Sequence, residues 1–582
     1  MLRHLCFALA VTTTFACSEK VLDAAAATPA SQSLNLGYEQ DAGTDTPAEW
    51  FVVPQAGYQP YVSDAGVAYQ GNRFLYFQST FPDTSQRVVC FNSLLSDVIR
   101  DSLELSFMVK SDGGRKLRYG VYYYAHGGEA AQPPRLIQVD QTRATNWEKQ
   151  TIAIPKRDLP GNILDFGLWI AGAGELWLDD WEVKADGMPY HAAVQQRIPA
   201  VTATDLAELQ AAVTPLPDGP PHTWKQEPHW LSGAVGDADI VLLGEATHGT
   251  KDFTELRTQL TRYLVEEMGF ITVALEASLP DVDRFNSALH SGLDQPALQE
   301  RIAEDLQFWM YRTSEYLSFF EWLASTEPGK VQLRGVDMQD YAYALGVLDT
   351  ELRKLKNDRL IELVDSLQRQ INQAEVALPL AEKLHRELSA GDDQGEAFQR
   401  NVRYASIIRD ALYWRSTAMT SSFRDSSMAA NARWLQDRSP NRKLVIWANN
   451  GHTRLTGGAM GDWLKRSSNG GKVFSVGLAS GQGKYLAKDY ITHNMVHDDL
   501  KPAPPDSWDF YFAQMGTPNF YLDLRRSGAT VSQYPDRRFR GVGAIATPHQ
   551  YSPVNLADDY DAIIYLDETE AAVPYRVNTP AS

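Results

Sequence analysis

The sequence predicts an α/β domain in the C-terminal two-thirds of the chain, preceded by an all-β sandwich of the jelly-roll type. After residue 200, short apolar runs rich in β-branched residues alternate with longer helical stretches, which is typical of a largely parallel sheet. Between residues 35 and 186, alternating polar and apolar residues are separated by turn residues, which is typical of a sandwich. A chain of 582 residues is long enough for two or three domains.

The first residues predict an export signal over residues 1–17. A basic start is followed by an apolar stretch from Leu5 to Phe15 and by small residues around Cys17, and the stretch is too short to span a bilayer. Two outcomes stay open: Cys17 is lipidated, or the signal is cleaved and the protein is secreted. Either outcome predicts an exported protein, in the periplasm, outside the cell or lipid-anchored at the cell envelope, with a flexible segment over residues 18–34.

The composition narrows the choice of partners. A formal net charge of −19 argues against nucleic acid as a partner, because an acidic chain repels phosphate. No later apolar run reaches membrane-span length, so the only membrane contact we expect is a lipid anchor at Cys17. The three cysteines, Cys6, Cys17 and Cys90, cannot form an internal disulfide framework once the signal is processed.

Residues 35–186 contain alternating runs that suit sandwich strands, such as Leu103–Val109 and Leu164–Ile170. With Leu34–Glu39 at the start and Gly172–Asp180 at the end, their order resembles the galactose-binding-like jelly-roll family. The resemblance implies a module that either binds a glycan or only packs beside an enzyme. We expect the tryptophans of this region to be core residues rather than sugar platforms, namely Trp50, Trp147, Trp169, Trp177 and Trp181.

We expect residues 187–200 to be a linker and residues 201–578 to form the α/β domain. The clearest helix is predicted over Asp252–Met268, where apolar residues share one face and Gly269 follows. Leucines at mostly helical spacing between Leu345 and Trp414 predict a helical insertion. Two roles stay open for it: it covers the edge of the sheet, or it is a surface helical pair with no role in substrate binding.

Four apolar runs of the α/β domain end abruptly in polar residues that can do chemistry. The runs are residues 240–243 before Glu245, 273–275 before Glu276, 331–335 before Asp337, and 444–447 before Asn449 and His452. Ligands of an open α/β sheet bind at the carboxyl ends of its strands. The sequence therefore predicts an active site at one edge of one sheet.

The first strand end offers a candidate general base. Glu245 and His248 are three residues apart in a turn that leads into a helix, so the carboxylate can hold the imidazole in one tautomer. Backbone N–H groups of the same turn can stabilise an oxyanion. Arg257, nine residues beyond His248, can add a permanent positive charge for a carboxylate or for developing negative charge.

The other strand ends supply further polar groups. A buried carboxylate at Glu276 needs a partner, and Arg257 and His248 are candidates. His452 can act as acid, base or orienting group. Asp337 ends its strand in the same way, and we favour a supporting role for it over a catalytic one.

These segments, in this order, resemble the erythromycin esterase family. The resemblance spans about residues 200–575 and rests on several dispersed motifs, which are Gly244–Glu276, Arg334–Asp337, Arg424–Ala429, Trp447–His452, Tyr521–Arg525 and Tyr560–Tyr565. It implies an α/β core with helical additions. It also implies hydrolysis of the macrolactone ester of fourteen-membered macrolides without a serine nucleophile.

The resemblance places five residues at the family's active-site positions, with His248 as the base that activates water; the five are Glu245, His248, Arg257, Glu276 and His452. One position departs from the family. Its strand end usually has the order His-Asn-x-His, whereas Asn449 stands at the first His position here. An asparagine can hydrogen-bond but cannot shuttle a proton, which puts efficient macrolide hydrolysis in doubt.

Three other functions are alternatives to hydrolysis by His-activated water. The chain has no Gly-x-Ser-x-Gly turn, so a serine esterase is not indicated. Two His and two Glu could hold zinc in a metal-dependent hydrolase, but no His-Glu-x-x-His is present and Asn449 removes a further ligand. The remaining alternative is a glycan- or surface-binding protein whose α/β domain has lost activity.

We therefore expect an exported hydrolase of a small-molecule ester or lactone that needs no metal and no cofactor. His248 takes a proton from water while Glu245 orients it, and Arg257 stabilises negative charge. Glu276 and His452 position water or protonate the leaving alkoxide. Asn449 and Asp337 are expected on the substrate-binding side of the site.

Overall fold

The computed structural model describes most of the chain between residues 34 and 575. The described ranges are 34–39, 47, 49–53, 58–63, 68–79, 87–112, 117–126, 134–139, 145–161, 163–306, 308–391, 393–417, 421–467, 472–489, 492–535, 537–547 and 550–575. The predicted export signal, Cys6, Cys17 and nearly all of the predicted flexible segment lie outside them. No helix in these ranges is long and apolar enough to cross a membrane.

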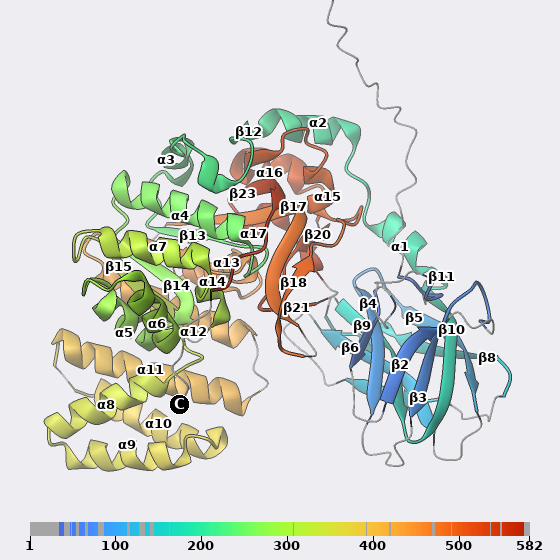
Figure 1. Ribbon diagram of the computed structural model, residues 1–582, viewed down its shortest axis with the longest axis horizontal. Coiled ribbons are helices and arrows are strands. Elements are labelled where there is room, and N and C mark those ends of the chain that lie inside the picture. The colour runs from blue at the N-terminus through green and yellow to red at the C-terminus, as the bar shows by residue number, and fades with distance from the viewer. Residues whose placement is uncertain are drawn as a thin grey trace, which may run out of the picture.

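The N-terminal part is a sandwich of two antiparallel sheets (Figure 1). The first sheet has the order β1 (Phe51–Val53), β4 (Val88–Leu95), β9 (Ile163–Ala171), β6 (Arg118–His126) and β7 (Arg135–Gln138). The second has the order β2 (Tyr58–Ser63), β3 (Phe74–Ser79), β10 (Gly174–Ala185), β5 (Ser102–Ser111) and β8 (Glu148–Pro155), with the short 3-10 helix Lys156–Asp158 after β8. The sequence-based prediction of a β-sandwich is confirmed.

An aromatic cluster fills the space between these two sheets. Trp50 and Trp181 are buried there, with ring centroids 5.5 Å apart, and both contact Phe166. Trp169 is also buried. Trp169 lies outside this core cluster and Trp147 and Trp177 are only half-buried, so the predicted core role holds for Trp50 and Trp181.

The stretch expected to be a linker is folded onto the sandwich. It contains β11 (Met188–Pro189), which pairs with β10, and α1 (Tyr190–Arg197). Tyr190 and Ala193 belong to the sandwich core, and the Tyr190 hydroxyl accepts a hydrogen bond from the Leu95 N–H at 2.7 Å. The sandwich therefore extends to about residue 197.

The α/β domain is built on one mixed sheet. Its strand order is β12 (Thr214–Pro215), β19 (Asn519–Asp523), β23 (Ala562–Thr569), β17 (Val473–Asp489), β13 (Ile240–Leu243), β16 (Leu444–Trp447), β14 (Thr272–Ser278) and β15 (Gln332–Asp337). Neighbouring strands from β23 to β15 all run parallel to one another. β19 pairs antiparallel with β23, and β12 pairs antiparallel with β19. The parallel sheet predicted from the sequence is thus present, with an antiparallel edge added.

The long strand β17 projects beyond this sheet toward the sandwich (Figure 1). Its far end pairs with β18 (Met495–Asp499) and β21 (Ile545–Ala546), and a separate two-stranded ribbon joins β20 (Arg537–Arg540) to β22 (Tyr551–Val554). Lys501 and Glu49 form an ion pair of 3.2 Å between the two parts of the protein.

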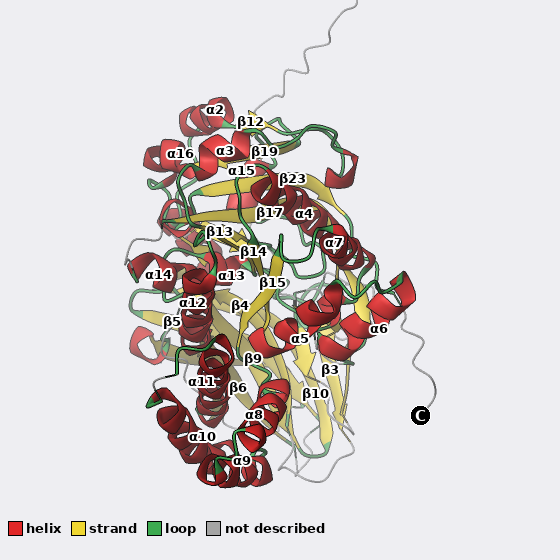
Figure 2. Ribbon diagram, turned by 90° about the vertical axis from the view of Figure 1, so that its left-hand side faces the viewer, coloured by secondary structure: helices red, strands yellow, loops and turns green. Residues whose placement is uncertain are grey.

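Helices cover both faces of the sheet (Figure 2). Along β13, Val241 and Leu243 pack into one helical layer and Ile240 and Leu242 into the other, which explains why the strand is apolar throughout. The first layer holds α3 (Trp230–Val235), α4 (Lys251–Glu266), α5 (Leu279–Leu289), α6 (Gln295–Asp305) and α7 (Ser314–Ser325), with 3-10 turns at Pro221–Thr223 and Trp309–Tyr311. The second holds α12 (Ser421–Arg438), α13 (Asn450–Thr453) and α14 (Met460–Arg466).

The predicted helical insertion is present beyond the β15 end of the sheet (Figure 1). It consists of α8 (Ala342–Lys354), α9 (Asp358–Gln370), α10 (Ala374–Ser389) and α11 (Glu396–Ser416). Around the opposite edge lie α2 (Ala203–Ala212), α15 (Trp508–Phe512), α16 (Leu524–Val531) and α17 (Leu556–Asp559).

The separate hydrophobic clusters predict that the α/β domain folds without the sandwich. A chain that begins at Pro199 should be soluble and monodisperse in gel filtration and should unfold cooperatively on heating. A chain that begins at Gly187 should aggregate more, because it keeps Tyr190 and Ala193 without the core that buries them. Aggregation of the shorter chain would show that the two parts depend on each other.

Candidate active site

The sheet order brings the four predicted strand ends together. β13, β16, β14 and β15 are adjacent and parallel, with Leu243 and Leu275 both paired to Trp447. Their carboxyl ends therefore lie at one edge of the sheet. The polar residues that follow these strands form a buried network at that edge.

In the first part of the network, Glu245 contacts His248 and is itself paired with Arg257. The His248 Nδ1 lies 2.7 Å from Glu245 Oε1, and the Arg257 guanidinium lies 2.5 Å from Glu245 Oε2. Arg257 is 0% exposed, stacks on Trp447 at 4.7 Å and donates to the Tyr316 hydroxyl at 3.2 Å. Burial alone would lower the pKa of Arg257, but the Glu245 carboxylate together with Tyr316 and Tyr311 outweighs burial and raises the pKa. A guanidinium at this depth acts on Glu245 rather than on bound substrate.

Close backbone packing explains the two glycines of this turn. Neither Gly244 nor Gly249 has a positive φ. A Cβ on Gly244 would lie 2.2 Å from Asn450 Oδ1, and one on Gly249 would lie 1.9 Å from the Leu486 carbonyl oxygen. Glycine is needed here because neighbouring groups approach the turn, and this packing fixes Glu245 and His248 against the sheet.

The second part of the network is centred on Glu276. Its Oε1 accepts from Arg424 Nη2 at 2.8 Å and lies 3.2 Å from His452 Nε2, while its Oε2 accepts from the Asn449 backbone N–H at 2.8 Å. Burial alone would raise the pKa of Glu276. The His452 and Arg424 charges outweigh burial and hold the pKa well below its usual range, and His248 adds to the same effect. Glu276 therefore stays ionised beside the His452 imidazole.

Arg424 binds a second strand end as well. Its Nη2 donates to Asp337 Oδ2 at 2.7 Å and its Nε contacts both Asp337 oxygens at 3.2 Å. Met338 and Gln339 donate to the same carboxylate. Asp337 is fully buried, so it supports Arg424 and does not reach the substrate side.

His452 lies between two carboxylates. Its Nδ1 is 2.7 Å from Asp425 Oδ1, and its Nε2 faces Glu276 and lies 2.8 Å from Arg424 Nη1. Burial alone would lower the pKa of His452, but Glu276 and Asp425 raise it to about 10. The ring therefore holds a proton at neutral pH.

Asn449 has mainly a local structural role. Its side-chain oxygen accepts from the Gly451 N–H at 3.0 Å and caps the short helix α13. Its amide donates weakly to the Val542 carbonyl at 3.4 Å. The backbone of Asn449, rather than its side chain, contacts the Glu276 carboxylate.

Sequence reasoning did not select Arg424 and Asp425 as site residues. Both lie in the first turns of α12, whose inner face carries polar residues such as Asn431, which donates to the Val336 carbonyl at 2.6 Å. Tyr311 was also missed, and its hydroxyl donates to the Glu276 carbonyl at 2.9 Å. The sequence does contain a signal for Arg424 and Asp425, because this Arg-Asp pair lies in a helix that has no apolar stripe. Among the residues that the structure describes, no three His, Cys, Asp or Glu side chains are arranged to hold a metal ion.

Comparisons with known proteins agree on one family. The sequence model of the family described as "Erythromycin esterase" matches residues 265–569. A protein of Bacillus subtilis named "Putative hydrolase YbfO" is 22% identical, over 57% of this chain and 84% of its own length. "Erythromycin esterase type I" of Escherichia coli is 26% identical, over 39% of this chain and 64% of its own length. A crystal structure of a Bacillus cereus protein has a TM-score of 0.56 at 20% identity, covering 64% of this chain and 99% of that protein, and shows the shared fold.

Glu245, His248 and Arg257 precede the matched segment, so their place in the site comes from the structure alone.

The buried position of Arg424 predicts a large loss of stability when it is removed. Arg424→Met should lower the free energy of unfolding by about 3–5 kcal/mol, because Glu276 and Asp337 would stay buried without their cation. The measurement is urea unfolding. Arg359→Met is the matched control and should change stability far less, because Arg359 is 74% exposed in its pair with Glu387. Similar losses in the two variants would contradict the supporting role of Arg424.

Proposed function

The chain belongs to the erythromycin esterase family, and from that premise we propose that it is a hydrolase that cleaves an ester or lactone with water activated by His248. The observation that carries the proposal is the Glu245–His248 hydrogen bond of 2.7 Å, backed by the buried Arg257. A carboxylate on Nδ1 fixes the tautomer that leaves Nε2 free to accept a proton. The His248 side chain is 9% exposed, which suits a base that meets substrate in a recess.

In the proposed reaction, Nε2 of His248 removes a proton from water as the water oxygen attacks the carbonyl carbon. The carbonyl π electrons move to the carbonyl oxygen and form a tetrahedral intermediate. When the electrons return, the bond between carbon and the alkoxy oxygen breaks, and the imidazolium of His452 turns its Nε2 proton from Glu276 to the leaving alkoxide and transfers it, which leaves His452 neutral and still bound to Asp425 through Nδ1. General acid–base catalysis of this kind contributes about 10²–10⁴-fold.

The network gives His452 the properties of a general acid. Its raised pKa keeps it protonated, and Glu276 and Asp425 hold the ring from both nitrogens. In this proposal Arg257 holds Glu245 in place and Asp337 holds Arg424 in place. In the proposed reaction, backbone N–H groups of the turn around His248, together with His452, stabilise the negative charge on the carbonyl oxygen.

The names of the relatives favour a macrolide lactone as the substrate class. Asn449 lacks the proton-transferring group that the family pattern has at this position. We therefore propose hydrolysis of a lactone or ester with macrolides as the first candidates. Export and glycan binding by the sandwich belong to the same proposal, as a means of holding the enzyme at the cell envelope.

His248→Ala should abolish ester hydrolysis and leave the fold intact, because His248 lies in a turn and packs little apolar surface. Hydrolysis of macrolides and aryl esters is measured by mass spectrometry, with circular dichroism as the control for folding. Wild-type turnover by the variant would remove His248 as the base. If EDTA stops the wild-type reaction and zinc restores it, the water is activated by a metal instead.

Asn449→His should increase macrolide hydrolysis by up to about a hundredfold, because an imidazole there restores a second proton-transferring group beside His452. The variant loses the cap of α13, so a stability loss of about 0.5–2 kcal/mol is expected. The rate of ring opening is compared between the two proteins. If the variant gains nothing while the wild type cleaves an unrelated ester well, the macrolide assignment is wrong and the hydrolase assignment stays.

A further inference from the structure

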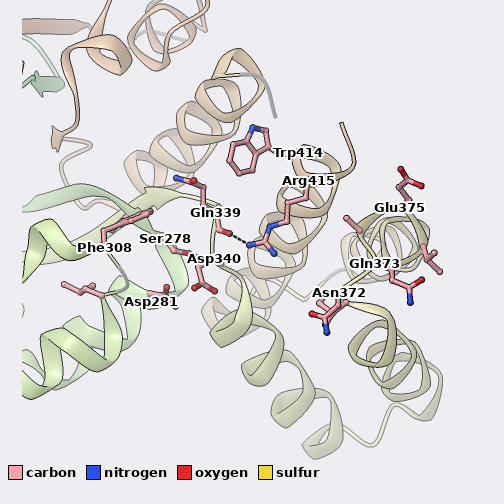
Figure 3. Close-up of a pocket in the computed structure, with 15 residues that line it drawn as sticks. Ser278, Asp281, Phe308, Gln339, Asp340, Asn372, Gln373, Glu375, Trp414 and Arg415 are labelled. Carbon is pink, nitrogen blue, oxygen red and sulfur yellow. Dashed lines mark hydrogen bonds between the residues drawn. The ribbon is translucent and has the colours of Figure 1, made fainter. Parts of the chain in front are cut away.

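A cleft of about 960 Å³ adjoins the buried network. It lies between the carboxyl ends of β14 and β15, the start of α5, and the helical insertion (Figure 3). Ala277 and Ser278 line it and follow Glu276 directly. Gln339 lines it too and donates to Asp337 at 2.6 Å. The cleft is therefore continuous with the residues that hold the proposed centre.

The lining combines apolar surface with carboxylates. Phe308 and Trp414 offer aromatic rings from opposite walls, and Ile371 and Val376 add aliphatic surface from the insertion. Asp281, Asp340 and Glu375 also line it. Such a lining fits a ligand with a large apolar body and few polar groups.

Asp281 has no hydrogen-bond or ion-pair partner among the described residues, although it is only 7% exposed. Of the described arginines, neither Arg284 nor Arg415 bonds to Asp281. Arg284 binds Asp305 at 2.8 Å, and Arg415 donates to the Gln339 carbonyl at 3.1 Å and to the Tyr341 hydroxyl at 3.0 Å. An unpaired carboxylate at this depth is costly to the fold, since buried charges are normally paired.

The burial of Asp281 should appear in how the stability of the fold depends on pH. Burial, with Asp340 and Asp305 adding to it and Arg284 opposing it, raises the pKa of Asp281 to about 7. A raised carboxyl pKa means that stability falls as pH rises from about 4 to 7, because only the folded state then keeps the proton. A group that weakens the fold at neutral pH and faces a cleft beside the reacting centre is a candidate ligand contact.

We propose that this cleft binds the non-reacting part of the substrate and that Asp281 pairs there with a protonated amine carried on an apolar body. The apolar walls hold the body, and the carboxylate selects the cation. Asp340 and Glu375 add to the negative field and Arg415 is the one cation among the described residues that line the cleft, so the three carboxylates outnumber it and an anionic group is disfavoured. The inference deepens the proposed function in naming a substrate feature, but amine binding itself needs no hydrolysis.

The test measures binding by isothermal titration calorimetry with two matched probes, N,N-dimethyl-2-(1-naphthyl)ethylamine and the neutral 2-(1-naphthyl)ethanol. The wild type should prefer the amine by about tenfold or more, as expected for a charge-assisted contact. Asp281→Asn should remove the preference. Glu375→Gln is the matched control, since Glu375 lines the same cleft but is exposed, and it should keep most of the preference.

The preference should grow between pH 6 and pH 8 in the wild type, as Asp281 ionises, and stay flat in Asp281→Asn. The same near-isosteric variant should melt a few degrees higher than the wild type at pH 8, which also shows that it folds. Equal binding of the two probes, no binding of either, or an unchanged preference in Asp281→Asn would each overturn the proposal. Repeating the titration on His248→Ala protein separates this outcome from a failure of the hydrolase proposal, because amine binding should be unaffected there.

Discussion

The whole site depends on one buried guanidinium. Arg424 joins Glu276 on β14 to Asp337 at the end of β15 and contacts His452, which follows β16. Carboxylates at neighbouring strand ends would repel one another in a low dielectric, and burial without a cation would favour their neutral forms. The charges of His452 and Arg424 together hold the pKa of Glu276 well below its usual range, whereas Glu276 and Asp425 raise the pKa of His452 against the opposing charge of Arg424. The charge states that the proposed chemistry needs therefore follow from the cluster of Arg424, Glu276, Asp425 and His452 acting together.

The same arrangement occurs twice. His248 is held by Glu245, which is held by Arg257, and His452 faces Glu276, which is held by Arg424. The two sets differ in that Asp425 occupies the second nitrogen of His452 and Arg424 contacts the His452 ring directly. An imidazole with one carboxylate partner keeps a free nitrogen and suits a base, whereas an imidazole between two carboxylates keeps its proton and suits an acid. The assignment of base and acid thus rests on the number of carboxylates at each ring.

The sequence was sufficient for the parts that depend on local pattern. Apolar runs that stop at Glu245, Glu276 and Asp337 marked the strand ends, and their convergence follows from parallel pairing. Arg424 could not be found in this way, because it is 148 positions from Glu276 and lies on a helix whose buried face mixes polar and apolar residues. The fold of residues 187–197 was missed for a related reason. Only Tyr190 and Ala193 of α1 are buried, which is too weak a periodic signal to distinguish a packed helix from a linker.

The position of Arg424 also connects the proposed substrate cleft to the reacting centre. α11 ends at the cleft, where Trp414 and Arg415 form part of the wall, and α12 carries Arg424 in its first turn. Contacts with the non-reacting part of a substrate are thus made at the end of α11. The next helix, α12, carries Arg424, which binds Glu276 and Asp337. Substrate contacts with Trp414 and Arg415 would thus act close to Arg424, and through it on Glu276 and His452. Such remote contacts raise the rate only when they hold the reacting groups in the geometry of the transition state, which is what this connection provides.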